Sequence, residues 1–243
     1  MNAIETHNLT KRYRSLTAVD GLNLTVTAGE LFALLGVNGA GKSTAIRMLS
    51  CLTRPDGGDA EICGHSVVRD AAAVKACIGV SPQETAVAPN LTAAENLALM
   101  CGVHGMNRRT TAEKTAALAA QLGLGEVLHR RAGRLSGGWQ RRLSIAMALV
   151  SDPQVLFLDE PTLGLDVLAR SELWDVIRAL KGRTTIVLTT HYMEEAEALA
   201  DRVGVMKSGR MIALGTVAEL TAQTGAANLE GAFLALVKGA DAQ

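Results

Sequence analysis

The feature that most narrows the fold of this chain is a glycine-rich segment between an apolar run and a helical stretch. Residues 36–43 read Gly-Val-Asn-Gly-Ala-Gly-Lys-Ser and fit the pattern G-x-x-x-x-G-K-[ST]. Residues 31–35 before it are continuously apolar, as in a buried strand, and residues 42–50 after it are apolar on one helical face. Such a match arises by chance in on the order of one chain per hundred of this size. The sequence therefore predicts a phosphate-binding strand, loop and helix.

Each residue type in this loop has a physical reason to be there. Glycines let successive backbone N–H groups turn towards phosphate oxygens, and the N-terminus of the following helix adds partial positive charge. Lys42 is predicted to neutralise β- and γ-phosphate oxygens, and the Ser43 hydroxyl to hold Mg²⁺. The nucleotide-binding residues predicted in this segment are Gly36, Asn38, Gly39, Gly41, Lys42, Ser43 and Thr44.

The remaining strand signals indicate an α/β chain. Residues 155–158 and 184–189 form continuous apolar or β-branched runs, which are typical of parallel strands covered on both faces. Four segments alternate more and are expected to be antiparallel edge strands, namely residues 4–9, 22–26, 203–206 and 211–214.

Strand signals vanish between about residues 91 and 151. Thr92-Ala-Ala-Glu95 has the pattern of a capping box, and the Ala-rich residues 110–122 predict a second helix. We therefore expect one domain, residues 1–243. Within it we expect an α/β core with a β edge (1–88 and 152–243) and an inserted helical subdomain (89–151).

Composition excludes several classes of protein. Lys plus Arg and Asp plus Glu are both 24, which disfavours nucleic acid as a partner. No apolar run approaches the roughly 18 to 20 residues that span a bilayer, and the amino terminus does not have the pattern of a secretory signal. The four cysteines lie far apart, without zinc-ligand spacing. A cytoplasmic protein is expected.

Two carboxylates follow one of the predicted strands. Residues 155–160 read Val-Leu-Phe-Leu-Asp-Glu, so the acids fall at the carboxyl edge of a parallel sheet. Asp159 is predicted to hold Mg²⁺ directly or through water, and Glu160 to orient and deprotonate an attacking water. In isolation, an acid at a strand end is commonly just solvated. Beside a phosphate loop, the catalytic interpretation is favoured.

A further motif names a family. Residues 135–149 begin Leu-Ser-Gly-Gly-Trp-Gln and continue as a helix, which closely resembles the signature of ATP-binding-cassette proteins. Ser136 can cap this helix, while Gly137 and Gly138 leave room for a second anion. The resemblance covers nearly the whole chain. It implies a P-loop NTPase fold with a RecA-like mixed sheet, and a signature that completes the ATP site of a second copy.

Other positions take their roles only from this resemblance. Tyr13 matches an aromatic that stacks on adenine, and Gln83 matches the glutamine that senses Mg²⁺ and the attacking water. Asp166 matches a residue of the segment that crosses the dimer interface. His191 matches a histidine that contacts the γ-phosphate. Without the resemblance, Tyr13 would be a half-buried strand residue and His191 a structural histidine.

The chain departs from the family pattern at two positions. Trp139 replaces the glutamine most often found after the two glycines, so either the grip on the γ-phosphate in trans is altered or the ring packs at the cassette interface or against the helical subdomain. Val167 stands where a proline commonly follows the interface aspartate, which costs some turn rigidity and removes no chemistry.

The resemblance implies an ATPase that uses ATP and Mg²⁺ and works as a homodimer. A separate membrane permease would receive it on the cytoplasmic face of the cell membrane, in a transporter of exporter type. The alternative is a soluble assembly ATPase, such as the cassette of iron–sulfur cluster assembly. A binding-only switch would require damaged hydrolytic residues, and none of these residues is damaged.

Overall fold

Two β-sheets define the architecture of the computed structural model, which describes residues 1–240. A four-stranded antiparallel sheet has the order β2-β1-β4-β5 and a six-stranded sheet the order β10-β9-β3-β8-β7-β6. The first sheet comprises β1 (Asn2–Tyr13), β2 (Leu16–Thr27), β4 (Gly57–Ile62) and β5 (His65–Ser66). The second comprises β3 (Leu31–Leu35), β6 (Ile78–Ser81), β7 (Val155–Asp159), β8 (Thr185–Thr190), β9 (Arg202–Lys207) and β10 (Arg210–Gly215).

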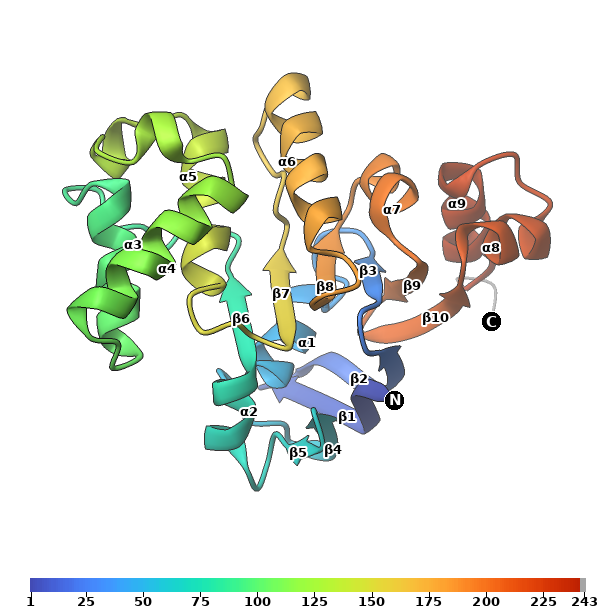
Figure 1. Ribbon diagram of the computed structural model, residues 1–243. Helices are drawn as coiled ribbons and strands as arrows, with labels where there is room; N and C mark the ends of the chain where they lie inside the picture. Colours follow the sequence, from blue (N-terminus) through green and yellow to red (C-terminus); the bar gives the residue numbers. More distant parts are fainter. Residues whose placement is uncertain (241–243) are drawn as a thin grey trace.

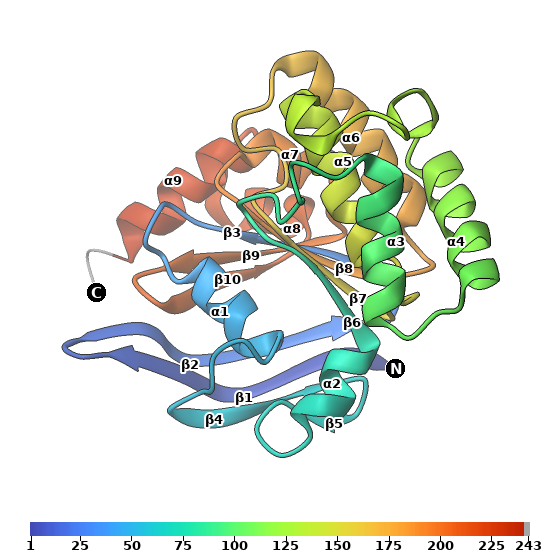
Figure 2. The ribbon, with the colours of Figure 1, turned by 90° about the vertical axis from the view of Figure 1, so that its left-hand side faces the viewer.

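Helix α1 (Lys42–Leu49) lies between the two sheets, as Figure 2 shows. Its buried side chains belong to a core shared by β1, β2 and β4 of the small sheet and one face of the large sheet, which includes Phe32 and Phe157. The other face of the large sheet packs in a second core against the helices that follow β6. The α/β class and the mixed sheet predicted from the sequence are confirmed.

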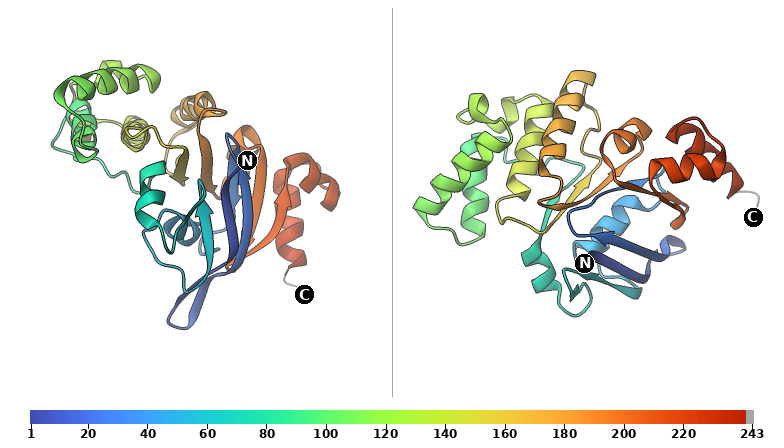
Figure 3. Two further views of the ribbon diagram at one scale, coloured as in Figure 1. Left: turned by 60° about the horizontal axis from the view of Figure 1, so that its bottom comes forward. Right: turned by 45° about the vertical axis from the view of Figure 1, so that its right-hand side comes forward.

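Helices cover the rest of the molecule (Figure 1). Helices α3, α4 and α5 gather beyond the β6 edge, whereas α8 and α9 lie at the β10 edge (Figures 1 and 3). Their bounds are α2 (Ala71–Cys77), α3 (Ala93–Val103), α4 (Arg108–Gln121), α5 (Gly137–Ala148), α6 (Val167–Leu180), α7 (Met193–Leu199), α8 (Val217–Thr224) and α9 (Leu229–Gly239). Among the described residues, no helix is long and apolar enough to cross a membrane.

The predicted parallel strands and the first predicted helices are present. β3 pairs in parallel with β8, and β8 with β7. The capping box before α3 is complete, because the Glu95 amide donates to the Thr92 hydroxyl and the Thr92 amide donates to the Glu95 carboxylate. Between residues 91 and 151 the β-pairing is limited to a single bridge, Thr92 to Arg131.

The predicted edge strands need two corrections. β1 and β2 are antiparallel as predicted but belong to the separate small sheet, and β9 lies inside the large sheet, where it pairs in parallel with β3 and antiparallel with β10. Only β10 is an antiparallel edge of that sheet. The apparent alternation in β9 comes from Gly204, where a Cβ atom would meet the Phe32 ring at 2.7 Å. The glycine in this strand therefore reflects close packing against Phe32 and does not indicate a half-exposed strand.

The carboxyl-terminal helix α9 docks on the second core. Phe233 is 3% exposed there, whereas Leu234, the next residue of the same helix, is 48% exposed. The amphipathic helix α9 therefore packs on the chain's own core through the face that carries Phe233.

We expect Phe233→Ala to destabilise the fold far more than Leu234→Ala. Removing the buried ring leaves a cavity and should lower the free energy of unfolding by about 3 kcal/mol, whereas truncating the exposed leucine should cost less than about 1 kcal/mol. Equilibrium denaturation of both variants by urea measures the difference. Equal losses would contradict the docking of α9.

Candidate functional site

A hollow of about 470 Å³ lies at the carboxyl ends of β3, β7 and β8. This is the edge at which parallel α/β sheets bind ligands. The predicted site residues that line it are Tyr13, Asn38, Gly39, Gly41, Lys42, Ser43, Thr44, Gln83, Glu160 and His191. Residues that are up to 178 positions apart in the sequence thus share one pocket, because β3, β8 and β7 are neighbours in the sheet at about 4.8 Å per strand.

The glycines of the loop are required by its conformation. Gly39 has φ +82° and Gly41 has φ +105°, a left-handed region that disfavours side chains. A Cβ at Gly41 would meet the Ala18 carbonyl oxygen at 2.3 Å, and one at Gly36 would meet the Met206 carbonyl oxygen at 2.6 Å. Gly36 does not line the hollow but lets the loop pass close to β9. The loop therefore presents backbone instead of side chains.

Lys42, the first residue of α1, points its ammonium group at oxygen atoms. Its Nζ donates to the carbonyls of Gly36 at 2.7 Å and Val37 at 3.3 Å, and it lies 3.2 Å from Glu160 Oε1. The side chain is buried, so these contacts compensate the cost of removing the charge from water. A buried cation held among oxygen acceptors next to a helix N-terminus fits a phosphate ligand.

The two strand-end acids are held in different ways. Asp159 Oδ1 accepts from the Ser43 hydroxyl at 3.0 Å and from the Thr189 hydroxyl at 2.5 Å. Paired hydroxyl and carboxylate oxygens are hard ligands of the kind that Mg²⁺ binds. Glu160 follows in the left-handed region, with φ +49°, a strained conformation for a residue with a side chain. That turn directs its carboxylate towards the hollow.

Thr189 orders both acids, and the sequence analysis missed it. Its hydroxyl accepts from the Glu160 amide at 3.0 Å while it donates to Asp159 Oδ1. The residue is fully buried near the end of β8. A threonine in an apolar β-branched run carries no separate signal, because threonine is also an ordinary strand residue.

His191 follows β8 and contacts the second acid. Its Nδ1 lies 2.7 Å from Glu160 Oε2, so both oxygens of Glu160 have a partner, Lys42 on one side and His191 on the other. The His191 ring also lies 4.1 Å from the Tyr192 ring, centroid to centroid. The structure therefore brings Lys42, Glu160 and His191 into one cluster.

A second buried carboxylate lies behind this cluster on α7. Glu195 is fully buried and accepts a hydrogen bond from Trp174 Nε1 at 3.2 Å. Burial raises the pKa of the Glu195 carboxyl, and the nearby Glu160 acts in the same direction. The sequence analysis assigned no role to it.

The signature residues do not enter this pocket. Ser136 is the residue before α5, as predicted, but its side chain makes no capping hydrogen bond, so the expected cap is absent. Gly138 packs on α6, where a Cβ would meet the Ala169 Cβ at 3.2 Å. Asp166 instead caps α6 by accepting from the Ala169 amide at 2.9 Å. Ser136, Gly137, Gly138 and Asp166 are thus separate from the hollow around Lys42.

Trp139 is partly buried against the helical core and lies under the Arg142 guanidinium, 4.8 Å from the ring centroid. This arrangement matches the packing alternative given for Trp139. Tyr13 ends β1 at the rim of the hollow and is exposed, and Gln83 follows β6 and is exposed as well. Neither the Tyr13 nor the Gln83 side chain packs in a hydrophobic core.

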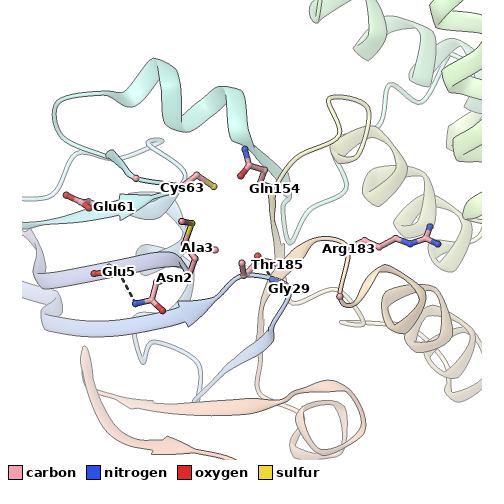
Figure 4. A pocket seen from close by; sticks show the side chains of 13 residues that line it. Asn2, Ala3, Glu5, Gly29, Glu61, Cys63, Gln154, Arg183 and Thr185 are labelled. Carbon is pink, nitrogen blue, oxygen red and sulfur yellow. Dashed lines mark hydrogen bonds between the residues drawn. The ribbon is translucent and has the colours of Figure 1, made fainter.

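A larger hollow, about 650 Å³, lies at the opposite ends of the strands (Figure 4). It is lined by residues that precede or begin β3, β7 and β8, among them Gly29, Gln154 and Thr185. Its lining, within residues 1–240, contains no residue of the phosphate loop and none of the predicted site residues. The hollow around Lys42 remains the candidate functional site.

Comparisons with known proteins agree with this site. The family model described as ABC transporter matches residues 19–163. The chain is 47% identical to the daunorubicin/doxorubicin resistance ATP-binding protein DrrA of Streptomyces peucetius, over 92% of this chain and 68% of that protein. It is 44% identical to Nod factor export ATP-binding protein I of Paraburkholderia xenovorans (strain LB400), over 90% and 73%.

Solved structures show the same fold. An ATP-binding subunit of an ABC transporter superposes with a TM-score of 0.85 at 27% identity, over 97% of this chain and 99% of that one. A dimeric post-hydrolysis state of an ATP-binding cassette bound to ADP and Pi gives a TM-score of 0.79 at 25% identity, over 88% and 98%.

Thr189→Val tests the role of the hydroxyl between the acids, and Thr185→Val on the same strand is its control. Thr185 is also buried and accepts from the Gly29 amide at 3.0 Å, at the far end of β8. Each variant should lose about 1 kcal/mol of stability. Only Thr189→Val should slow steady-state ATP hydrolysis, by roughly 10- to 100-fold, because only it releases both acids. Equal hydrolysis rates for Thr189→Val and Thr185→Val would exclude this role of the Thr189 hydroxyl.

Proposed function

This chain belongs to the ABC transporter family, and we propose that two copies of it close around Mg–ATP to power export through a separate membrane permease. The chain is an ATP-binding subunit that hydrolyses ATP to drive transport. Our proposal adds the residue roles, the partner subunits and the membrane location. It is carried by the cluster of Lys42, Ser43, Asp159, Glu160 and His191 around one pocket.

The residues fit an Mg–ATP substrate. The backbone of residues 36–44 and the Lys42 ammonium would hold the phosphates, and Tyr13 would stack on the adenine. Ser43, Asp159 and Gln83 supply oxygen ligands of the type that Mg²⁺ prefers. The ion would neutralise charge on the β- and γ-phosphate oxygens during transfer.

Glu160 is the general base in this proposal. Both of its oxygens are engaged in the free chain, Oε1 with Lys42 and Oε2 with His191. When phosphate oxygens take over Lys42, Oε1 becomes available to accept a proton from the attacking water. His191 keeps the carboxylate in place through Oε2, and it lies close enough to the pocket to contact the γ-phosphate as well.

The absence of the signature residues from the pocket supports a homodimer. Ser136, Gly137, Gly138 and Asp166 lie outside the chain's own pocket, so we propose that they complete the pocket of a second copy. Exposed apolar side chains accompany these elements, Val37 in the phosphate loop and Val167 and Leu168 at the start of α6. Contact with a second copy would remove them from water.

The permease would dock beside the helices α3 to α5, which with their connections form the helical subdomain that we place at residues 89–151. A hollow of about 180 Å³ between β6 and these helices is lined by Pro82, Ala86 and Met100. Leu99 and Val103 of α3 are exposed next to it. An apolar groove suits an amphipathic helix of a permease, with the chain held peripherally at the cytoplasmic face of the membrane.

The relatives favour export over the assembly alternative. Two of them bear names for daunorubicin resistance and Nod factor export, and a third, 38% identical over 91% of this chain and 72% of that protein, is the linearmycin resistance ATP-binding protein LnrL of Bacillus subtilis. We propose that this chain likewise powers outward transport of a small organic molecule by its permease.

Glu160→Gln tests the catalytic proposal. The amide cannot accept the proton, so Mg²⁺-dependent hydrolysis should fall by about 10²- to 10⁴-fold, while ATP binding persists and a dimer accumulates. Phosphate release and size-exclusion chromatography in ATP measure the two effects, and chelation of Mg²⁺ by EDTA should abolish wild-type turnover. Hydrolysis at the wild-type rate by Glu160→Gln would remove Glu160 from its role.

Val103→Asp tests the docking surface, and Leu52→Asp is a matched control. The two side chains are 70% and 67% exposed, but Leu52 lies after α1, away from the groove. In the cells that encode the chain, Val103→Asp should move the protein from the membrane pellet to the supernatant, because a charge in the groove opposes docking of an apolar helix. Purified Val103→Asp should keep the wild-type ATPase rate. Release of both variants, or of neither, would contradict this docking surface.

A further inference from the structure

Arg141, in the second turn of α5, is buried and holds the loop that carries Gln83. Its side chain is 5% exposed. One terminal nitrogen donates to the Pro82 carbonyl and the other to the Gln83 carbonyl, each at 2.6 Å. The planar guanidinium has donors at a fixed separation, so it can bridge two successive carbonyls at once. The Gln83 backbone is thereby fixed while its side chain stays at the pocket.

Two further polar contacts flank this bridge along α5. The Ser144 hydroxyl lies 2.8 Å from the Ser81 hydroxyl at the end of β6, and the Thr85 hydroxyl donates to the Gln140 side chain at 3.5 Å. β6 and α5 lie side by side in Figure 1. The segment from β6 into the Gln83 loop therefore follows one face of α5 over little more than one turn, with Arg141 as its charged contact.

The same helix carries the signature. Ser136 precedes the first residue of α5, and Arg141 lies five residues further on, about 7.5 Å along the helix axis. An α-helix of this length transmits displacement as a rigid body. A shift of the Gln83 loop that Arg141 follows would therefore shift Ser136 as well.

Buried charge gives Arg141 a second constraint. Burial lowers the pKa of Arg141, and the negative charges of the nearby Asp159 and Glu195 act in the opposite direction. The guanidinium is thus held between a core that carries the Mg²⁺ ligand Asp159 and a loop that carries Gln83. Its place in the structure connects these two parts of the site to the helix.

We propose that Arg141 is a positioning residue that makes the Gln83 loop and the signature end of α5 move as one body. ATP in a chain's own pocket, sensed at Gln83, then sets the position of the Ser136 that this chain offers to its partner. This inference rests on the proposed roles of Gln83 and Ser136 in a homodimer. It predicts that the two pockets of the dimer hydrolyse ATP cooperatively, and that the cooperativity depends on the double hydrogen bond of Arg141.

Arg141→Lys and Arg141→Met test the proposal, with Arg142→Lys as the matched control. Lysine keeps the charge, but its single nitrogen cannot occupy both positions that the two terminal nitrogens of the guanidinium take, so the geometry of the double hydrogen bond is lost. Methionine removes all donors. Arg142, the next residue, pairs with Glu172 at 2.5 Å, a contact that lysine can keep. We would measure kcat, KM for ATP, the Hill coefficient, the melting temperature and binding of a fluorescent ATP analogue.

The wild type should give a Hill coefficient above 1. Arg141→Lys should lower kcat about tenfold and bring the Hill coefficient close to 1, while KM and analogue binding change less than about twofold. Arg141→Met should lower kcat further, and Arg142→Lys should match the wild type in both properties. A fall in kcat without loss of binding or melting temperature separates positioning from a merely structural role.

Several outcomes would overturn the inference. These are a wild-type Hill coefficient of 1, Arg141 variants that match Arg142→Lys, or a loss of kcat that tracks a loss of melting temperature and analogue binding. The proposed function fails, and this inference with it, if the wild type does not hydrolyse ATP and Glu160→Gln does not form the ATP-bound dimer. If that dimer forms and only the Arg141 results fail, the proposed function stands.

Discussion

The parallel pairing of β3 with β8 and of β8 with β7 is the constraint on which the rest of the structure depends. Because parallel strands end at the same edge, the loop after β3, the acids after β7 and the histidine after β8 meet without any local sequence relation. The small sheet and α1 cover one face of these strands, and the helices cover the other. Both faces are therefore dry, and the exposed carboxyl edge is the place where charge can gather.

Charge at this edge is tolerated because each group has a partner. Lys42 is compensated by two carbonyls and Glu160, and Asp159 by the hydroxyls of Ser43 and Thr189. An unpaired ion at this depth would be strongly destabilising. The strained backbone of Glu160 is held because its amide donates to both the carbonyl and the hydroxyl of Thr189. The free chain thus keeps Lys42, Asp159 and Glu160 paired with neighbouring groups, in an arrangement in which a phosphate ligand could replace some of these contacts.

The pocket and the signature segment lie apart in the molecule. The phosphate loop, Glu160 and His191 line the pocket, whereas Ser136 and Asp166 lie outside it. Helix α5 joins the two parts, since Arg141 grips the loop of Gln83 five residues from the signature serine. A buried cation hydrogen-bonded to backbone carbonyls holds the position of a loop and leaves that loop's side chains available, which suits a connection between two sites.

The sequence by itself determined the local features: the phosphate loop between a strand and a helix, the two acids at a strand end, and the capping box at Thr92. Each is specified by neighbouring residues, because turn geometry, helix capping and side-chain periodicity act within a few positions. Only the tertiary structure decided the place of β9 beside β3, the Thr189 hydroxyl between Asp159 and Glu160, and the grip of Arg141 on the Gln83 loop. These depend on contacts between residues 29 to 170 positions apart, for which threonine, arginine and an apolar strand carry no distinguishing local pattern.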